Sequence, residues 1–471
     1  MMRPPPVAST PHLNPATTPA SPWPAFWIAS IAVFLVSIDS TVLFSAFGSL
    51  RKGFPGATQA DLSWVLNAYT IAYATMLIPA GGLADKYGRK HVFLFGVTLF
   101  LAASAVCGAA NTVTALILAR IVQALGAALL TPASLSIVLD AFPKDKRAVA
   151  VSLWGAVGGL AAAIGPSLGS YIVEAYGWPW AFYINLPLGA ISLYRGAARL
   201  GNVKGKADTV RLDVVGMLLL ILAVGSAAMA ITQFHTAAVS RLQLAGLGVV
   251  SLAAAGAFAL WARSSPAPLV EPALFANRSY SAANLATLSF GIAFAMMFFA
   301  FFAYLTGVWH YNLSTAGIAV TPGPLMVVPT AILTGKFAAR AGHRPVLVLG
   351  SLVYAAGGAW LLFVPGTEPR YLTHWLPGLL LNGIGTGMIL PSLSGAAVSN
   401  LHPAHYAVGI AVNQATRQLG SVLGVAITVL YVGHSKLMRA DFLPLYWTQV
   451  ALALTTCIAS MLVQKKEKRT R

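Results

Sequence analysis

The chain has 471 residues, of which 57% are hydrophobic and only 9% are charged. Soluble domains carry about 25% charged residues, so this composition excludes a soluble enzyme or binding domain and indicates an integral membrane protein. The net charge of +18 does not indicate nucleic-acid binding, because the basic residues form short clusters between apolar runs.

Fourteen continuous apolar runs follow one another along the chain. Each is near the ~20 residues that a helix needs to cross hydrocarbon, and none alternates like the strands of a membrane β-barrel. The predicted fold class is therefore all-α, a polytopic membrane protein with 14 transmembrane helices. The runs lie near 25–47, 62–84, 92–110, 114–139, 148–173, 180–199, 214–234, 242–262, 281–307, 313–335, 345–364, 373–399, 405–432 and 442–463.

A charged loop at 81–90 has a worn copy at 335–344 in the second half of the chain. The copy keeps two glycines and the basic end, although Ala339 stands where the first loop has Asp85. A loop repeated at the same place between two pairs of runs indicates a duplication. We therefore expect two six-helix bundles joined by a two-helix insert, with a cavity between the bundles near the bilayer midplane.

The expected domains follow from this duplication. They are a disordered cytoplasmic tail (1–24) that does not have the pattern of a signal peptide, an N-terminal six-helix bundle (25–200), a loop with the two-helix insert (201–263), a cytoplasmic linker (264–280), a C-terminal six-helix bundle (281–464) and a basic cytoplasmic tail (465–471).

The distribution of basic residues predicts the orientation. If the N-terminus is cytoplasmic, inward loops and tails hold 22 of the 30 Lys and Arg residues, and outward loops hold six. Basic residues concentrate on the cytoplasmic side of membrane proteins. We therefore expect an integral protein of the plasma (cytoplasmic) membrane with both termini in the cytoplasm.

Asp39 is the only acid clearly in the middle of an apolar run. A carboxylate near the bilayer centre is costly unless it is neutralised, paired or wetted by a cavity, so we expect Asp39 to carry a proton. Arg120 is its expected partner, and a movement that separates the two would free Asp39 to take a proton. Two alternatives stay open: Asp39 could cap a neighbouring backbone, and Arg120 could fasten helices through backbone carbonyls.

The loop at 81–90 and the ends of the neighbouring runs form a candidate gate. Gly81 should permit close packing at the end of its run, and Gly88 should permit a turn. We expect a charge cluster that holds in one conformational state and parts in the other. A simple topology signal is the alternative, but it would not explain an acid in this loop. The cluster would comprise Asp85, Arg89, Asp140 and Arg147.

Gly165, Pro166 and Gly169 predict a bent, closely packed helix at 148–173. Proline removes a backbone donor, and glycines one turn apart remove side-chain bulk. The residues alone indicate only that this helix is bent and closely packed.

The second half offers candidates for a substrate cavity. Arg417 lies near the middle of its run, one turn after Asn413 and Gln414. It could act on substrate or serve as a structural tie. Phe294 and Phe298 could line an apolar binding surface, or they could face lipid or pack against other helices.

Several of these segments together resemble the major facilitator superfamily, and within it the fourteen-helix drug:proton antiporter branch of multidrug efflux proteins. The resemblance covers about residues 25 to 464. The segments are Ile38-Asp39-Ser40-Thr41-Val42, Gly81-x-Leu83-Ala84-Asp85-x-x-Gly88-Arg89-Lys90, Arg120-x-x-Gln123-x-x-Gly126-Ala127-Ala128, Ala161-x-x-x-Gly165-Pro166-x-x-Gly169-Ser170 and Trp178-Pro179-Trp180-Ala181-Phe182-Tyr183-Ile184-Asn185-Leu186-Pro187.

The resemblance implies a secondary active transporter that exports lipophilic or amphipathic small molecules, such as drugs, in exchange for protons. It also implies that Gly165, Pro166 and Gly169 take part in the conformational change of this export. Its partners would be the substrate, protons and the lipid bilayer, with no nucleic acid and no obligate protein partner. No cofactor or metal is expected, since the chain has no nucleotide-binding loop and a proton gradient would drive transport. A single mid-membrane acid favours neutral, weakly cationic or anionic substrates.

Two other functions were weighed. A transporter of the same fold could carry a specific metabolite or nutrient. An integral-membrane enzyme would need a metal cluster or a nucleophile with its base, and the nine histidines have no ligand spacing, so we expect no enzyme.

Overall fold

The computed structural model describes residues 21–143, 146–201, 212–234, 239–399, 401, 406–433 and 437–464. Most of the expected tail at 1–24 and all of the tail at 465–471 lie outside these ranges. Within them every regular element is a helix and no strand occurs, which confirms the all-α class.

The first half contains seven helices in the described residues, because the sixth apolar run is broken into two. They are α1 (Trp23–Gly53), α2 (Gln59–Tyr87), α3 (Arg89–Gly108), α4 (Val113–Ala141), α5 (Arg147–Tyr176), α6 (Trp180–Tyr183) and α7 (Asn185–Arg199).

The insert is a helix pair, α8 (Val214–Thr232) and α9 (Arg241–Ser264). In the second half, one apolar run is divided into two helices, α11 and α12, because the helix is interrupted at Thr321, just before Pro322. The remaining elements are η2 (Pro272–Ala276), α10 (Arg278–Gly307), α11 (Leu313–Val320), α12 (Pro322–Ala341), α13 (His343–Phe363), η3 (Tyr371–Trp375), α14 (Leu376–Val398), α15 (Tyr406–Val432) and α16 (Arg439–Met461).

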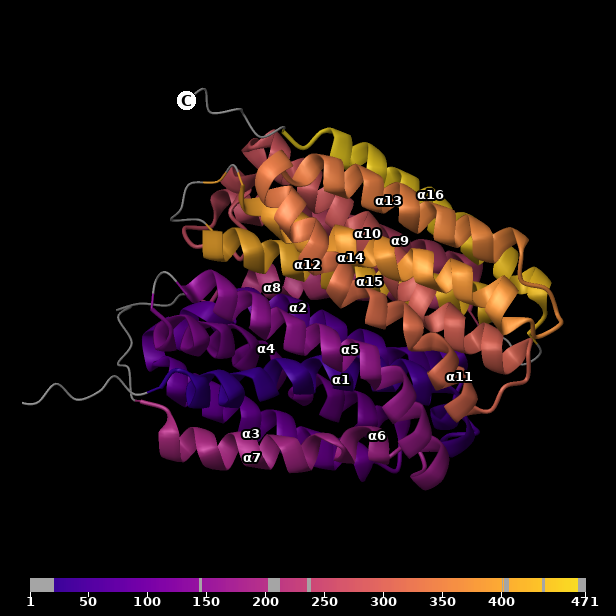
Figure 1. Ribbon diagram of the computed structural model, residues 1–471, viewed down its shortest axis with the longest axis horizontal. Coiled ribbons are helices and arrows are strands. Elements are labelled where there is room, and N and C mark those ends of the chain that lie inside the picture. Colours follow the sequence, from indigo (N-terminus) through magenta and orange to yellow (C-terminus); the bar gives the residue numbers. More distant parts are fainter. Residues whose placement is uncertain are drawn as a thin grey trace, which may run out of the picture.

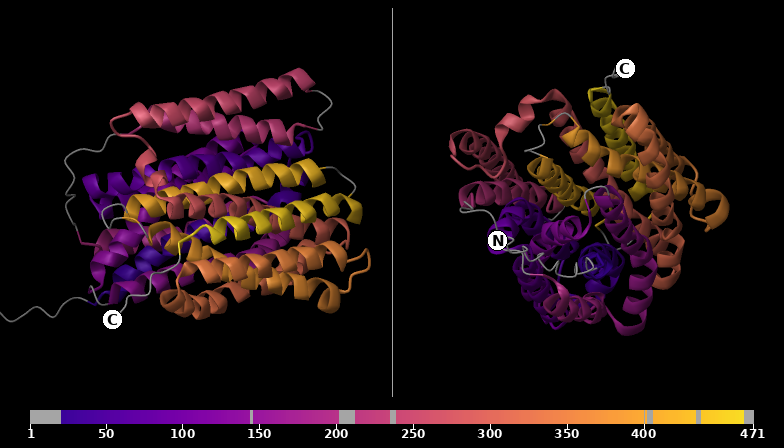
Figure 2. Two further views of the ribbon diagram at one scale, coloured as in Figure 1. Left: turned by 90° about the horizontal axis from the view of Figure 1, so that it is seen from above. Right: turned by 60° about the vertical axis from the view of Figure 1, so that its left-hand side comes forward.

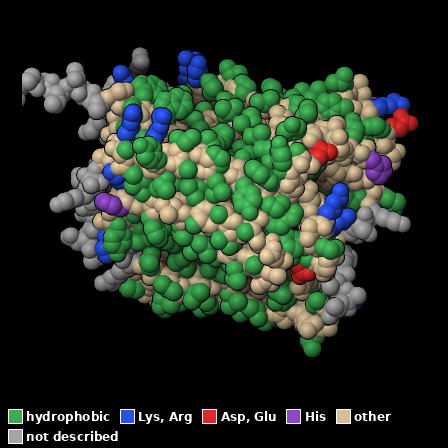
Figure 3. Space-filling view, turned by 90° about the horizontal axis from the view of Figure 1, so that it is seen from below, with side chains coloured by type: hydrophobic (Ala, Val, Ile, Leu, Met, Phe, Trp, Pro, Cys, Tyr) green, Lys and Arg blue, Asp and Glu red, His purple; other side chains and the backbone are tan. Residues whose placement is uncertain are grey.

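Twelve helical segments of the described chain are long and apolar enough to cross a membrane, with α11 and α12 taken as one segment. The other two of the fourteen expected crossings are α2, which is long enough but carries polar residues such as Asn67 and Thr75, and the α6–α7 pair, interrupted at Ile184. On the face drawn in Figure 3, the middle is mainly apolar and charged side chains lie towards the two ends.

The two halves of the chain form two bundles that lie side by side (Figure 1). The N-terminal bundle contains α1–α7 and the C-terminal bundle contains α10–α16. We call the end of the molecule at which α1 begins and α16 ends the terminal end, and the opposite end the far end; the terminal end is at the left of Figure 1.

Both bundles use glycines to bring neighbouring helices together. A Cβ on Gly126 of α4 would lie 2.6 Å from the Phe100 nitrogen of α3, and a Cβ on Gly385 of α14 would lie 2.8 Å from the Tyr354 nitrogen of α13. Small residues allow this close backbone approach where lipid gives no hydrophobic force between helices. The same device at corresponding helix pairs is consistent with a duplication.

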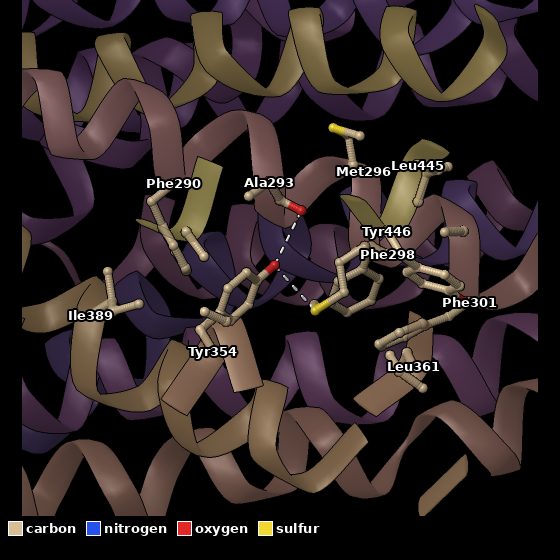
Figure 4. Close-up of a cluster of buried hydrophobic side chains, with 14 of the residues drawn as sticks. Phe290, Ala293, Met296, Phe298, Phe301, Tyr354, Leu361, Ile389, Leu445 and Tyr446 are labelled. Carbon is tan, nitrogen blue, oxygen red and sulfur yellow. Dashed lines mark hydrogen bonds between the residues drawn. The ribbon is translucent and has the colours of Figure 1, made fainter. Parts of the chain in front are cut away.

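The C-terminal bundle has an aromatic core around Tyr354 (Figure 4). The Tyr354 hydroxyl donates to the Ala293 carbonyl oxygen at 3.1 Å and lies 3.3 Å from the Met297 sulfur. The ring packs edge-on against Phe290 at 5.3 Å between centroids. These contacts join α13 to α10, so the hydroxyl is satisfied without water inside the bundle.

The insert lies at one edge of the molecule, where α8 and α9 form the pink pair at the top of the left view in Figure 2. Asp213 anchors it by accepting three hydrogen bonds, from the Gly216 nitrogen at 2.8 Å, the Trp261 indole at 2.7 Å and the Leu269 nitrogen at 2.7 Å. The carboxylate therefore caps α8 and also ties α8 to the end of α9 and to the segment that follows.

Candidate functional site

Asp39 lies near the middle of α1 with only 2% of its surface exposed. Its Oδ2 accepts from Arg120 Nη1 at 2.7 Å, and its Oδ1 accepts from Gln123 Nε2 and from Asn185 Nδ2, each at 2.9 Å. The carboxylate is thus held by side chains from α4 and α7. We call Asp39, Arg120, Gln123 and Asn185 the polar centre.

Arg120 is as deeply buried as its partner, with 1% of its surface exposed. Its Nε donates to the Val65 carbonyl oxygen of α2 at 3.1 Å, and its Nη1 also lies 2.5 Å from Gln123 Oε1. The guanidinium carbon is 3.9 Å from the centre of the Tyr69 ring, a cation–π contact. Arg120 therefore both pairs with Asp39 and fastens α4 to α2, which unites the two readings that the sequence left open.

Two members of the polar centre were not assigned to the site from sequence. Gln123 follows Arg120 by three residues and so shares its face of α4, and Asn185 is the first residue of α7. Both amides also reach the Ser104 hydroxyl of α3, at 2.8 and 3.3 Å. Their position within otherwise apolar runs was the signal available, because a buried amide needs partners.

The polar centre lies inside the N-terminal bundle, since all its members come from α1, α4 and α7, with Ser104 from α3. It does not lie between the two bundles. Tyr69 of α2 lies against Arg120, and α2 also contacts α15 of the other bundle, so α2 links the polar centre to the bundle interface.

Helix α5 continues as a single helix through Pro166 and packs closely on α1. A Cβ on Gly165 would overlap the Thr41 hydroxyl, and a Cβ on Gly169 would lie 2.7 Å from a Val42 methyl. α5 also contacts α11 and α12 of the other bundle. The glycines therefore permit the close contact that the sequence predicts, in a helix that borders both bundles.

At the far end, α5 and α11 touch across the bundles. The Ser314 nitrogen, in the first turn of α11, donates to Glu174 Oε2 at 2.7 Å. A Cβ on Gly317 would lie 2.6 Å from the Pro166 carbonyl oxygen, so the two backbones are in direct contact. Phe47 of α1 and Phe299 of α10 meet nearby, with 4.7 Å between ring centres. The bundles are thus closed against each other at the far end.

At the terminal end, Arg89 pairs with two carboxylates. Arg89 Nη2 lies 3.4 Å from Asp85 Oδ1, and Arg89 Nη1 makes an ion pair with Asp140 at the end of α4. The three side chains are partly exposed. α5 begins at Arg147, but the Arg147 side chain lies outside the described residues, so its expected place in the cluster is not tested.

The two glycines of this loop differ. Gly88 has φ +91°, in the left-handed region that favours glycine, and it separates α2 from α3. Gly81 does not serve the expected close packing, because a Cβ added there would meet nothing within 4 Å. The packing prediction for Gly81 is wrong, since its face of α2 looks into open space.

The C-terminal candidates separate into two groups. Asn413 is buried and donates to Asn284 Oδ1 and Thr287 Oγ1 of α10, so it joins α15 to α10. Gln414 Oε1 instead accepts from Arg417, at 3.2 Å from Nε and 2.9 Å from Nη2. The Arg417 side chain is partly exposed.

Phe294 and Phe298 form a row on α10 that reaches the other bundle. Their rings lie 5.3 Å apart, and Phe298 lies 5.9 Å from Phe44 of α1. Phe298 is buried and Phe294 is partly buried. The row therefore lies at the α1–α10 contact, where the two bundles meet.

Comparison with known proteins gives a family match over most of the chain. A model described as Major Facilitator Superfamily matches residues 29–425. The chain is 34% identical over 425 residues to an uncharacterized MFS-type transporter of Mycobacterium tuberculosis, covering 86% of this chain and 69% of that protein.

Two relatives have more specific names. A puromycin resistance protein of Streptomyces alboniger is 32% identical over 437 residues, covering 91% of this chain and 85% of the relative. A multidrug transporter protein of Bacillus subtilis is 29% identical over 402 residues, covering 84% of this chain and 73% of the relative. A crystal structure of a peptide transporter has the same fold, with a TM-score of 0.68 at 18% identity over 96% of each chain.

Proposed function

The chain belongs to the major facilitator superfamily and is an integral membrane transporter, not an enzyme; from this premise we propose that it exports lipophilic or amphipathic small molecules in exchange for protons, by alternating access. In this proposal both termini lie in the cytoplasm and the membrane is the plasma membrane. The basic loops of the terminal end support this orientation.

The buried pair of Asp39 and Arg120 carries the proposal. The pair is electrically neutral as long as Asp39 is ionised. Adding a proton to Asp39 removes the negative charge and leaves Arg120 as a buried cation without its counter-ion, which is costly in a low-dielectric interior. Proton binding therefore favours another arrangement of α1 and α4, and this links the proton to a change of shape.

Contacts at the two ends of the molecule support alternating access. The far end is closed by α5 against α11, through Glu174 and the Ser314 nitrogen. The charge cluster of Arg89, Asp85 and Asp140 at the terminal end involves only the N-terminal bundle. In the opposite state the far-end contact would part, while the charge cluster would take a second arrangement.

The proposed substrate class follows from the surface where the bundles meet. Phe44 and Phe298 bring aromatic rings from α1 and α10 together there, and partly buried Phe294 extends the same row. Apolar and aromatic side chains with a few polar groups are typical of sites for small lipophilic ligands. The names of the multidrug and puromycin-resistance relatives support the same class.

Proton movement evoked by substrate in proteoliposomes tests the proposal. A pH-sensitive dye inside the vesicles reports protons while puromycin, tetraphenylphosphonium or dansylglycine is added, so that cationic and anionic compounds are both represented. We expect at least one compound to move protons with the wild-type protein and none to do so with Asp39→Asn.

The matched control is Glu368→Gln, which neutralises an exposed carboxylate paired with Arg370 in a loop. This variant should couple as the wild type does. If Asp39→Asn moved protons at the wild-type rate, Asp39 would have no part in coupling. If none of the compounds evoked proton movement with the wild-type protein, the proposed proton exchange itself would be contradicted.

A further inference from the structure

Arg417 is a cation near the middle of a membrane helix with an incomplete set of partners. Its Nε and Nη2 both donate to one acceptor, Gln414 Oε1, which lies one turn earlier on the same helix. Among the residues that the structure describes, no carboxylate lies within ion-pair distance, 4.0 Å, of Arg417. The charge is therefore not neutralised within that part of the protein.

The contrast with Arg120 shows how unusual this is. Arg120, on α4 of the other bundle, has a carboxylate, a side-chain amide and a backbone carbonyl as acceptors, together with an aromatic face. An arginine that holds helices together has such an arrangement, because its donors bond acceptors on several helices. Within the described part of the chain, Arg417 bonds only Gln414 of its own helix, so its guanidinium joins no two helices there. A buried cation without an anion is costly.

The position of Arg417 is at the seam between the bundles. α15 packs on α10 of its own bundle and on α2 of the other one. The backbone of Arg417 faces α10, because a Cβ on Gly291 would lie 2.6 Å from the Arg417 carbonyl oxygen. Its side chain is close enough to Tyr73 of α2 for an electrostatic interaction and stays partly exposed.

Tyr73 connects this position to the polar centre. The Tyr73 and Tyr69 rings are stacked on one face of α2, 6.1 Å apart and 5° from parallel. Tyr69 in turn lies against the Arg120 guanidinium at 3.9 Å. Two stacked rings of α2 thus extend from Arg120, which holds the proposed proton site, towards the position of Arg417 in the other bundle.

We propose that Arg417 binds the negative charge of the transported compound, so that the substrates include lipophilic carboxylates. This inference rests on the proposed function, in that it assumes a transported small molecule. The planar guanidinium can form two parallel bonds to a carboxylate, which a neutral ester cannot match. Phe294, on α10 less than a turn beyond Gly291, supplies the apolar side of the site.

Binding of matched acids and esters to purified protein in lipid nanodiscs tests the assignment. The probes are dansylglycine and pyrenebutyric acid, each compared with its own methyl ester, which keeps the apolar part and removes the charge. For the wild type we expect at least one acid to bind about tenfold or more tightly than its ester. Arg417→Gln should bring that ratio to about one, and Arg417→Lys should retain part of it because the charge remains without the planar fork.

The matched control is Arg370→Gln, an equal change of charge at an exposed arginine paired with Glu368. It should keep the wild-type ratio. An acid-to-ester ratio near one for both pairs in the wild type overturns the proposal without any variant. An unchanged ratio in folded Arg417→Gln overturns it as well, and if that variant does not fold, an unchanged ratio in Arg417→Lys does so.

This experiment is independent of proton coupling, because binding in nanodiscs requires no gradient. A wild-type protein that prefers acids but moves no protons contradicts the proposed exchange and supports the anion site. A protein that exchanges protons for a cation yet binds acid and ester equally supports the exchange and contradicts the anion site.

Discussion

Asp39 and Asn185 are 146 positions apart in the chain, yet the Asn185 amide donates to the Asp39 carboxylate at 2.9 Å. The bond fixes the start of α7 against the middle of α1 and makes α7 part of the polar centre. Helix α7, which begins directly after the interruption at Ile184, thus contributes its first residue to the site proposed to bind the proton.

Replacing Asn185 should therefore destabilise the N-terminal bundle. Asn185→Ala removes a donor to a buried charged group and to Ser104, and loss of a hydrogen bond to a charge costs about 1.5–3 kcal/mol. We expect a lower thermal unfolding temperature in detergent. Asn111→Ala, at an exposed residue between α3 and α4, is the control and should leave the unfolding temperature unchanged. Equal melting of the two variants would contradict a structural role for the Asn185 amide.

Gly165 should not tolerate a side chain. Gly165→Ala places a methyl group on the Thr41 hydroxyl, and overpacking of this kind costs about 1–3 kcal/mol. We expect export activity to fall at normal expression, since α5 must then move away from α1. Gly155→Ala on the same helix should be neutral, because a Cβ there meets nothing within 4 Å.

A second substitution tests the cause of that loss. Thr41→Ala removes the hydroxyl that the new methyl group would overlap, so the double variant Gly165→Ala/Thr41→Ala should recover part of the lost stability. Strictly additive effects of the two changes would show that the two positions do not interact.

The Arg89–Asp140 pair should matter for transport more than for stability. The pair is partly exposed, and such pairs contribute roughly 0–1 kcal/mol to folding. Asp140→Asn is expected to slow transport while changing the unfolding temperature little, and exchange of the two residues, Arg89→Asp with Asp140→Arg, should restore part of the rate. Asp85→Asn should have the smaller effect, because its contact with Arg89 is longer, at 3.4 Å. Transport rates of the Asp140→Asn and Asp85→Asn variants in a vesicle assay test this, and a slower Asp85→Asn variant would contradict the expected order.

Glu174 should hold the far end closed. Glu174→Gln replaces a charge-assisted bond to the Ser314 nitrogen with a neutral one, a difference of about 1 kcal/mol or a factor of about five in the ratio of open to closed molecules. Ser170→Cys, buried where α5 meets α11, reports opening through its rate of reaction with a membrane-impermeant maleimide, in a background without Cys107 and Cys457. The rate should rise about fivefold with Glu174→Gln and stay unchanged with Glu368→Gln.

The positions of the helices were predictable from sequence because a bilayer requires long continuous apolar segments, and such segments are read directly from composition. The pairing of Asp39 with Arg120 could be anticipated for a related reason: two opposite charges in apolar runs need each other. The direction in which a polar side chain points could not be predicted. Asn413 faces α10 and Gln414 faces Arg417, although the two are adjacent.

The reason lies in the solvent. In a soluble protein the polar face of a helix marks the outside, but lipid is as apolar as the protein core, so a membrane helix shows no such periodicity. The prediction of close packing at Gly81 was wrong for the same reason. A glycine near a helix end has the same appearance in sequence whether a neighbouring helix or open space lies beside it, and only the assembled bundle distinguishes these cases.

The insert helix α8 touches both halves of the molecule, α2 on one side and α15 on the other. Ile71, Ala228 and Val422, one from each of the three helices, pack into a single small cluster. A movement of the bundles that separates α2 from α15 must therefore either move α8 as well or break its contacts with one of these two helices. Helix α8 thus covers the α2–α15 side of the contact between the bundles, and a relative movement of the bundles has to include the insert.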